Sequence, residues 1–581
     1  MKKLCIIFFS ALILLISCEN IEDVGSGRKE AEKKESETKT IPDSNFTTPH
    51  VDFFTILPNQ QQISFDTKYN GRKAFIIFSN STYANETIGS DNITFNQNAS
   101  DGSSISDKYK MDIYSNAVPL GNGLFRNEVQ FYNNGVYKGE KITANNSRAA
   151  ANPGYYNNHN PDSNNKSKFW AIIDDSKTPK EVDFELKADG QHCRIWVADN
   201  NRSVIDINQI DSSNYQNLAC IFDAAFPKEI AVFGSNAIHY SNTITANEST
   251  KIDILIYDLF GDAAPDTTSA TYGFFRSTDM YRNTTTNITN SNECELINID
   301  SYCWKKGIDG TDDGTGNIIH DHQSESTLVH EFQHLLNFCN KRQNYSNWFT
   351  EMLSMSCEEV LQETIHLSDV DSPKSRFNLY FDKPYLGFKN WPQSNSPNIL
   401  YFYCNAYAFG TYLMRNYGGI KLIHEIATNN YVDGNSITEA LKTLGYNETF
   451  ESVISKFGMI YIFADGKGIT LNTEKNQKFN NVEYKLSKID LNEYYFHKYP
   501  NLTALQADQT VYRKNNSNYG RDAQNNYYLP GPTIYKNDAY KISDAIEPYG
   551  FSVYYLGTIQ SGRNYSVNHQ TNLTMTVVIR D

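Results

Sequence analysis

The sequence has few basic residues for its acidic content, no long apolar run after its first residues, and no two cysteines separated by two residues. Lys and Arg number 52 against 67 Asp and Glu, a formal net charge of −15 that argues against a nucleic-acid partner. A membrane-spanning helix needs about 20 consecutive apolar residues, and no stretch after the N-terminal segment provides them. Without a Cys-X-X-Cys pair, a zinc site built from cysteines is not expected either.

The first residues have the pattern of an export signal. Two lysines follow Met1, residues 4–16 are mostly apolar, and the segment ends in Leu15-Ile16-Ser17-Cys18. This ending resembles the lipobox of bacterial lipoproteins. The resemblance implies that residues 1–17 are a lipoprotein signal peptide and that the thiol of Cys18 carries a lipid, which would anchor the chain to a membrane of the bacterial cell envelope. The alternative is an ordinary signal peptide without a lipid.

Residues 18–49 are rich in Lys, Glu, Ser and Thr and contain few apolar residues. Such a segment cannot bury a core, so it is predicted to be a disordered tether. The chain that follows is long enough for several domains.

Short apolar runs bounded by turn residues predict β structure at both ends of that remainder. Residues 50–150 are predicted to form an N-terminal all-β domain, with Val51–Leu57 as a clear strand and Asn134-Gly135 as a hairpin turn. Residues 470–581 are predicted to form a C-terminal all-β domain, with Leu573–Ile579 as a strand. Neither region contains residues that indicate chemistry.

The region between them, residues 165–468, has strand patterns first and helix patterns afterwards. This order predicts an α+β domain in which a mixed sheet is followed by a helical subdomain. A helix is also expected among the strands, at Ser212–Phe226. The helices of the subdomain are expected at Asn405–Arg415, Ile420–Thr428, Ile437–Leu444 and Phe450–Phe463.

The motif His330-Glu331-Phe332-Gln333-His334 carries most of the functional prediction. Positions i and i+4 lie on one side of a helix, so the two imidazoles can share one tetrahedral Zn²⁺ ion. The helix then has an anchoring side and a side that presents ligands. The alternative is a surface helix with incidental histidines. The anchoring side consists of apolar residues that project almost opposite the histidines: Leu328, Val329, Phe332, Leu335, Leu336 and Cys339.

A catalytic zinc site takes three protein ligands and keeps one position open. Glu351 is the predicted third ligand, because the 16 residues between it and His334 are enough for a helix to end, a loop, and a second helix that runs back. Glu358 lies on the same face of that second helix and is predicted to orient a histidine ligand. Two alternatives remain open: Glu358 as the third ligand itself, and Glu358 and Glu359 as surface charges.

Other residues near the motif fit a metal less well. The acidic, Gly-rich stretch Asp309–Gly316 superficially suggests calcium, but it lacks the distal bidentate glutamate of an EF-hand loop, so a solvated loop is favoured. His320 and His322 are not expected to be ligands, because a loop presents them less rigidly than the helix that follows.

The stretch Leu328–Phe338, followed by Trp348–Ser354, resembles the hyicolysin-type zinc metallopeptidases of the gluzincin group. A looser similarity extends over about residues 170–465. The resemblance implies a zincin-like catalytic domain. One departure is Met352, where related sequences often have Gly. The site residues that it implies are His330, His334 and Glu351 as zinc ligands and Glu331 as the catalytic residue.

The resemblance also suggests a group that stabilises the oxyanion. The Tyr-X-X-Gly context of Tyr407 resembles the tyrosine of related gluzincin aminopeptidases, which implies that its hydroxyl donates to the developing negative charge. The alternative is that Tyr407 is a core or wall residue, like the neighbouring Tyr401, Tyr403 and Tyr412.

These residues predict a zinc-dependent endopeptidase that acts on proteins or peptides and is tethered to a membrane by a lipid, with its oligomeric state left open. Glu331 is placed to take a proton from water and pass it to the leaving amine. Glu295–Ile299, the last strand before the motif helix, is predicted to form the edge where an extended substrate adds a strand. It lacks the Gly-X-Met-Glu-Asn sequence that binds the N-terminal amine in gluzincin aminopeptidases. The alternatives are an aminopeptidase and a catalytically inactive, surface-binding lipoprotein on a metallopeptidase fold.

Overall fold

The computed structural model describes most of residues 159–491, with gaps of which the longest is 237–250, and parts of the regions on either side. The predicted signal peptide, Cys18, the tether and the turn at Asn134-Gly135 lie outside the described residues. The described flanking parts are 51–56, 62–65, 67–81, 95–96, 126–128, 498–499, 520–521, 527–528, 534–536, 546–560, 564–567 and 573–581.

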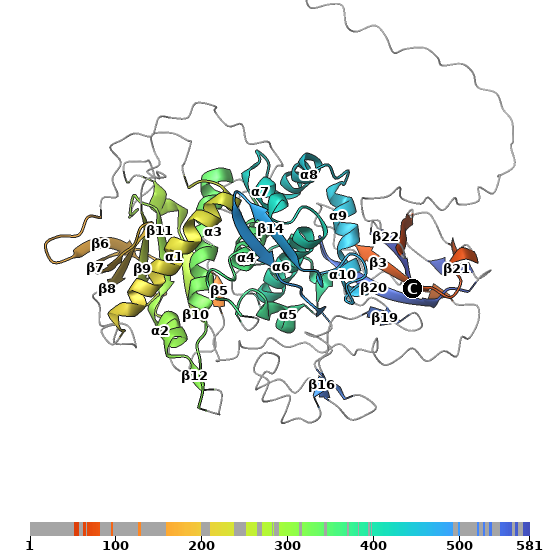
Figure 1. Ribbon diagram of the computed structural model, residues 1–581, viewed down its shortest axis with the longest axis horizontal. Coiled ribbons are helices and arrows are strands. Elements are labelled where there is room, and N and C mark those ends of the chain that lie inside the picture. Colours follow the sequence, from red (N-terminus) through yellow and green to blue (C-terminus); the bar gives the residue numbers. More distant parts are fainter. Residues whose placement is uncertain are drawn as a thin grey trace, which may run out of the picture. The chain divides into compact units, whose positions relative to one another are not determined.

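A seven-stranded mixed sheet forms the framework of the central region, as predicted (Figure 1). β9 pairs in parallel with both β8 and β11, whereas β10 returns antiparallel to β11. Every residue of β9 is buried, as expected for a parallel strand that is covered on both faces. In order across the sheet, the strands are β5 (Arg126–Glu128), β10 (Ala270–Phe275), β11 (Leu296–Asp300), β9 (Ile252–Tyr257), β8 (Cys193–Ala198), β7 (Lys180–Asp189) and β6 (Lys166–Ala171).

β11 is an interior strand, so the prediction that the last strand before the motif helix forms the sheet edge is wrong. β11 lies between β9 and β10, and all of its residues are buried. The chain passes through β10, which lies on the far side of β11 from β9, before it enters β11. Two apolar runs of similar length do not reveal this order. β10 in turn pairs on its outer side with β5, which comes from the N-terminal region.

Helix α1 (Ser212–Phe233) packs against the motif helix α3 (Gln323–Lys341). The rings of Phe222 and Phe226 each lie 5.2 Å from the ring of Phe332, measured between centroids. The sequence predicted that α1 would stop before Pro227, but the helix continues for a further turn and a half beyond this proline.

The predicted helical subdomain is present. The helices expected to begin at Asn405 and Ile437 begin earlier, at Ile399 and Asp433. The stretch expected as a single helix from Phe450 to Phe463 is divided at Gly458. A Cβ atom at Gly458 would lie 2.7 Å from Ile77 and 2.9 Å from Phe551, so the glycine permits close approach of strands from the two chain ends. The helices besides α1 and α3 are α2 (Ser301–Asp309), α4 (Asn347–Val360), α5 (Ser375–Tyr380), α6 (Ile399–Asn416), α7 (Ile420–Thr428), α8 (Asp433–Thr443), α9 (Phe450–Phe457) and α10 (Met459–Ile462).

The two terminal β regions, predicted as separate domains, share one five-stranded sheet. Strand β3 from the N-terminal region lies between β22 and β20 from the C-terminal region and pairs antiparallel with both. Strands that pair across most of the chain length have no local sequence pattern that identifies their partner. The prediction of two separate β domains was wrong for this reason. The order is β1 (Val51–Ile56), β22 (Thr574–Arg580), β3 (Lys73–Ser79), β20 (Phe551–Thr558) and β19 (Ile534–Lys536).

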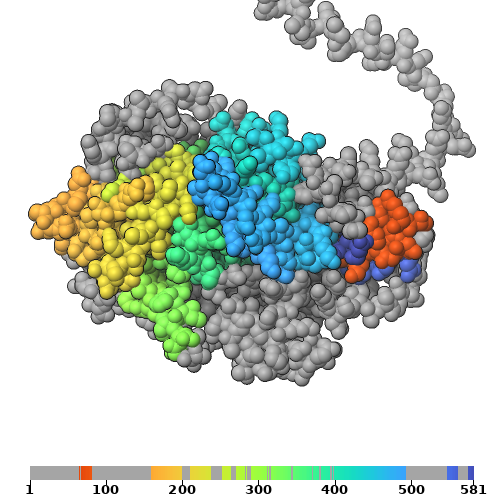
Figure 2. All heavy atoms as spheres, viewed as in Figure 1, coloured from red at the N-terminus to blue at the C-terminus, as the bar shows by residue number. Residues whose placement is uncertain are grey.

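The start of the predicted C-terminal domain also belongs with the helices. The hairpin of β14 (Lys475–Phe479) and β15 (Val482–Leu486), blue in Figure 2, lies beside α1, yellow, where Tyr484 donates a hydrogen bond of 3.1 Å to the carbonyl of Lys228. No helix in the described parts of the chain is long and apolar enough to cross a membrane. The remaining short strands are β2 (Gln62–Ser64), β4 (Phe95–Asn96), β12 (Thr311–Asp312), β13 (Ile318–Ile319), β16 (Lys498–Tyr499), β17 (Gly520–Arg521), β18 (Tyr527–Tyr528) and β21 (Asn564–Val567).

Candidate metal centre

Helix α3 is anchored by the apolar side that the sequence predicted. All six residues of that side are buried, and Phe332 packs on α1. The side that carries His330 and His334 is covered as well, because α4 packs against it. The two histidines are therefore buried on a helix that is packed on both sides, and they are not incidental surface residues.

The turn between α3 and α4 is held at both ends by buried charges. Lys341, the last residue of α3, donates to the carbonyls of Asn429 at 2.6 Å and Tyr431 at 2.7 Å. Asp433 accepts a hydrogen bond of 2.9 Å from the backbone N–H of Ser346, which precedes α4. These contacts fix the direction in which α4 returns along α3, and so the position of Glu351.

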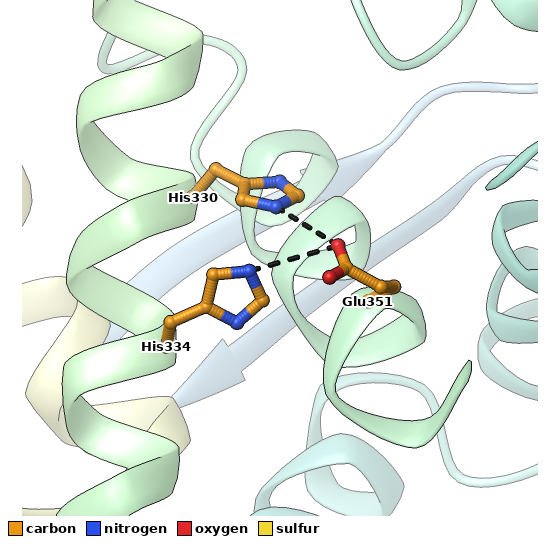
Figure 3. A group of neighbouring side chains, drawn as sticks. All are labelled: His330, His334 and Glu351. Atoms are coloured by element: carbon orange, nitrogen blue, oxygen red, sulfur yellow. Dashed lines mark hydrogen bonds and ion pairs between the residues drawn. The ribbon is translucent and has the colours of Figure 1, made fainter. Parts of the chain in front are cut away.

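The predicted ligands converge (Figure 3). The Nε2 atoms of His330 and His334 lie 3.2 Å and 3.6 Å from the same atom, Oε2 of Glu351. One ligand atom from each of the three residues lies within 4.8 Å of the others. Two imidazole nitrogens and a carboxylate oxygen at these separations fit a single divalent metal ion. Within the described parts of the chain, this is the one group of its kind, and His320 and His322 are not part of it.

Each histidine is held at its other nitrogen. Nδ1 of His330 lies 2.7 Å from Oε1 of Glu358, whose second oxygen accepts from the hydroxyl of Ser326. Nδ1 of His334 lies 2.9 Å from the hydroxyl of Thr350 and 3.0 Å from that of Ser354. These contacts fix the ring orientations and leave both Nε2 atoms directed at the site.

The same contacts decide between the open alternatives for Glu358. Its carboxylate meets the outer nitrogen of His330, whereas Glu351 faces the inner nitrogens of both histidines. Glu358 thus lies where a residue that orients His330 would lie, and Glu351 lies where a third ligand would; both roles stay predictions. The sequence analysis did not predict the contacts of Ser326, Thr350 and Ser354. The spacing of Thr350 and Ser354 on one face of α4 is a signal that was available in the sequence.

The two histidines keep the buried carboxylate of Glu351 ionised. Burial alone would raise the pKa of Glu351, but the charge of His334 and the hydrogen bond with His330 lower it well below its usual range. The carboxylate is therefore ionised in the interior, and it faces two imidazoles across a space of metal-site dimensions.

Glu331 lies beside the metal ligands and contacts the sheet. Its Oε2 atom accepts a hydrogen bond of 2.8 Å from the backbone N–H of Phe275, the last residue of β10. This bond holds the carboxylate of Glu331 against β10, the strand on which α3 packs most closely.

Tyr407 is fully buried on α6. Its ring packs against Phe377 of α5, with 5.0 Å between the centroids, and both residues belong to the main hydrophobic core. This is the environment of a core tyrosine, the alternative that the sequence left open. The donation of its hydroxyl to an oxyanion stays a prediction.

Comparison with known proteins yields one similarity that bears on this site. No family model matches the chain. The chain is similar to the neutral metalloprotease ShpI of Staphylococcus hyicus, with 27% identity over 183 residues, which are 30% of this chain and 35% of the relative. The chain thus spans about a third of the length of the curated relative that it matches. The similarity and the buried His330–His334–Glu351 group together support a metallopeptidase.

Proposed function

We propose that the chain is a zinc-dependent peptidase of the gluzincin type, related to the hyicolysin group, that cleaves proteins or peptides at internal bonds. The observation that carries the proposal is the convergence of both Nε2 atoms on one oxygen of Glu351, with Glu331 adjacent. Each ring is held from behind by a carboxylate or by hydroxyls, as zinc-binding histidines usually are.

In this proposal the chain's own residues supply binding and proton transfer. His330, His334 and Glu351 would hold the ion. Zinc, when bound, supplies Lewis acidity to hydrolysis at a peptide carbonyl. Glu331, positioned by the N–H of Phe275, takes a proton from the attacking water and delivers it to the leaving amine.

Tyr407 is retained as the proposed donor to the oxyanion. Its substitution by Phe is expected to lower kcat by about 10²-fold with unchanged zinc content and melting temperature. If the melting temperature changes and kcat does not, Tyr407 is a core residue only.

The proposal is tested with Glu331→Gln and a matched control, Glu325→Gln. Glu325 lies on the same helix, and burial raises its pKa to about 8, so its carboxyl is already mostly neutral at pH 7. Glu331→Gln is expected to lower casein cleavage by at least about 10²-fold while zinc remains bound, and Glu325→Gln should cleave like the unaltered chain. If the unaltered chain cleaves no faster than Glu331→Gln, the peptidase proposal is wrong.

Measuring the zinc content is a simpler test that distinguishes the peptidase from an inactive binding protein. The unaltered chain should contain one zinc per molecule, and His334→Ala should lose it. Peptides with a blocked N-terminus distinguish the two peptidase alternatives, because an aminopeptidase leaves them intact and an endopeptidase cleaves them.

We also propose that the chain is an exported lipoprotein of the bacterial cell envelope, anchored through Cys18. The support is the lipobox-like sequence Leu15-Ile16-Ser17-Cys18 alone. Labelled fatty acid should enter the unaltered chain and not a Cys18→Ser variant. Equal labelling of the two would remove this part of the proposal.

A further inference from the structure

The outer edge of β10 carries both Glu331 and a strand from the N-terminal region. The backbone N–H of Phe275 donates to Glu331 at 2.8 Å. Amides two residues apart in a strand point to the same edge, so Gly273 faces this edge as well. Gly273 is paired with Glu128 of β5. The β5 strand therefore reaches within two residues of the contact between β10 and the proposed catalytic carboxylate.

The position of this edge relative to α3 is fixed by close packing. A Cβ atom at Gly273 would lie 2.7 Å from the side chain of Thr327, one turn before the motif. At the other end of β10, the N–H of Thr271 donates to Asp262 at 3.1 Å. Side-chain carboxylates thus accept hydrogen bonds from the outward amides of Thr271 and Phe275. β5 pairs with Ala270, Thr271 and Gly273, and so ends two residues before Phe275.

An extended peptide binds a sheet edge through backbone hydrogen bonds, as an added strand. Within the described residues, the edge that lies next to Glu331 is that of β10, and β5 is already paired there. The pairing is parallel, covers three residues and shifts register between Thr271 and Gly273. A ladder this short and irregular is opened by breaking few hydrogen bonds.

We propose that β5 covers the substrate-binding edge of the enzyme and keeps peptidase activity low until it leaves β10. The inference rests on the proposed peptidase function. The incoming ligand would be an extended peptide whose backbone replaces β5 on β10. Removal or displacement of residues 126–128 would then activate the site without any change in the metal ligands.

The test is Asn127→Pro in the full chain, with Asn127→Ala as the matched control. Asn127 is the middle residue of β5, opposite Thr271. Proline has no N–H and does not fit inside a ladder, so it should release β5, whereas alanine keeps the backbone. The expected result is a rise in kcat/KM for an internally quenched peptide of about tenfold in Asn127→Pro, mainly through a lower KM, with zinc content unchanged. Asn127→Ala should match the unaltered chain.

Equal or lower activity of Asn127→Pro, with zinc retained, would overturn the inference. Failure of this variant to fold would do so too, because β5 would then be an integral part of the sheet. If no form of the chain cleaves peptide, the peptidase proposal fails. Hydrogen exchange at the amide of Gly273 then tests separately whether β5 can leave β10. Faster exchange in Asn127→Pro than in Asn127→Ala supports a displaceable cover, and equal exchange overturns it.

Discussion

Two neighbouring carboxylates on α4 show how much a residue's role depends on its partner. Glu358 and Glu359 are both fully buried, so the alternative that they are surface charges is wrong. Glu358 approaches Nδ1 of His330 at 2.7 Å, whereas Glu359 pairs with the guanidinium of Arg415. The first carboxylate contacts a histidine of the proposed metal site, and the second neutralises a buried cation.

Glutamine substitutions should separate these two roles. Glu358→Gln replaces a charged acceptor by a weaker neutral one, so zinc affinity is expected to fall by about 10–100-fold, measured by competition with a chelator. Glu359→Gln is the matched control. It leaves Arg415 buried without a carboxylate and should lower the free energy of unfolding by about 3–5 kcal/mol, while the folded fraction keeps its zinc affinity. Equal loss of zinc affinity in both variants would contradict the assignment.

At the scale of elements, the junction of β11 and α2 contains an acid with an unusual pKa. Asp300 ends β11 and accepts hydrogen bonds from the N–H groups of Cys303 at 2.8 Å and Leu259 at 2.9 Å. Burial outweighs these bonds and raises the pKa of Asp300 to about 7. The native state therefore binds a proton that the unfolded chain releases near the ordinary pKa of an aspartate, 3.8.

This junction should make stability depend on pH in a defined direction. Between about pH 4 and 7 the folded chain holds more protons at Asp300 than the unfolded chain, so the free energy of unfolding falls as pH rises, by at most about 4 kcal/mol from this residue. Asp300→Asn has no such proton, so urea unfolding at pH 5 and pH 8 should show a smaller decline. The change of unfolding free energy with pH is compared, and not its absolute value. The side-chain amide of Asn accepts a hydrogen bond from only one of the two N–H groups, so this variant is also less stable at every pH. Asp309→Asn, at the exposed end of α2, should keep the original slope, and a matching change there would refute the prediction.

Elements and ligands that depend on local spacing could be predicted from the sequence. The period of α3 identified its buried side. The three predicted ligands, within 22 residues of each other, lie together because two adjacent helices position them. The order of β10 and β11 was missed, because strand order is set by packing among distant segments. The hydroxyls behind His334 were missed for a related reason: serine and threonine are common, and only the geometry of α4 against α3 gives these two a function.

At the scale of the whole described chain, the five-stranded sheet joins the terminal regions to the helices. The two faces of β3 enter different cores. Phe75 and Ile77 belong to the large cluster that includes α3 and α9, whereas Ile76 and Phe78 belong to a second cluster within the terminal β region. Phe551 of β20 also packs against the helices, because its ring centroid lies 5.0 Å from that of Phe457 in α9. A core shared in this way predicts that the sheet and the metal-binding helices unfold together.

Ile77→Ala tests this coupling with a natural reporter. All five tryptophans lie between residues 170 and 391, so their fluorescence reports on the central region and not on β3. Removing the buried side chain of Ile77 should cost about 2–5 kcal/mol and shift the tryptophan-monitored melting transition down together with the temperature at which zinc is released. Ile318→Ala, at a side chain that is 51% exposed, is the control and should leave both temperatures unchanged. If the tryptophan transition of Ile77→Ala stays where it is in the unaltered chain, the terminal sheet is an independent folding unit and the prediction of a shared unfolding transition is wrong.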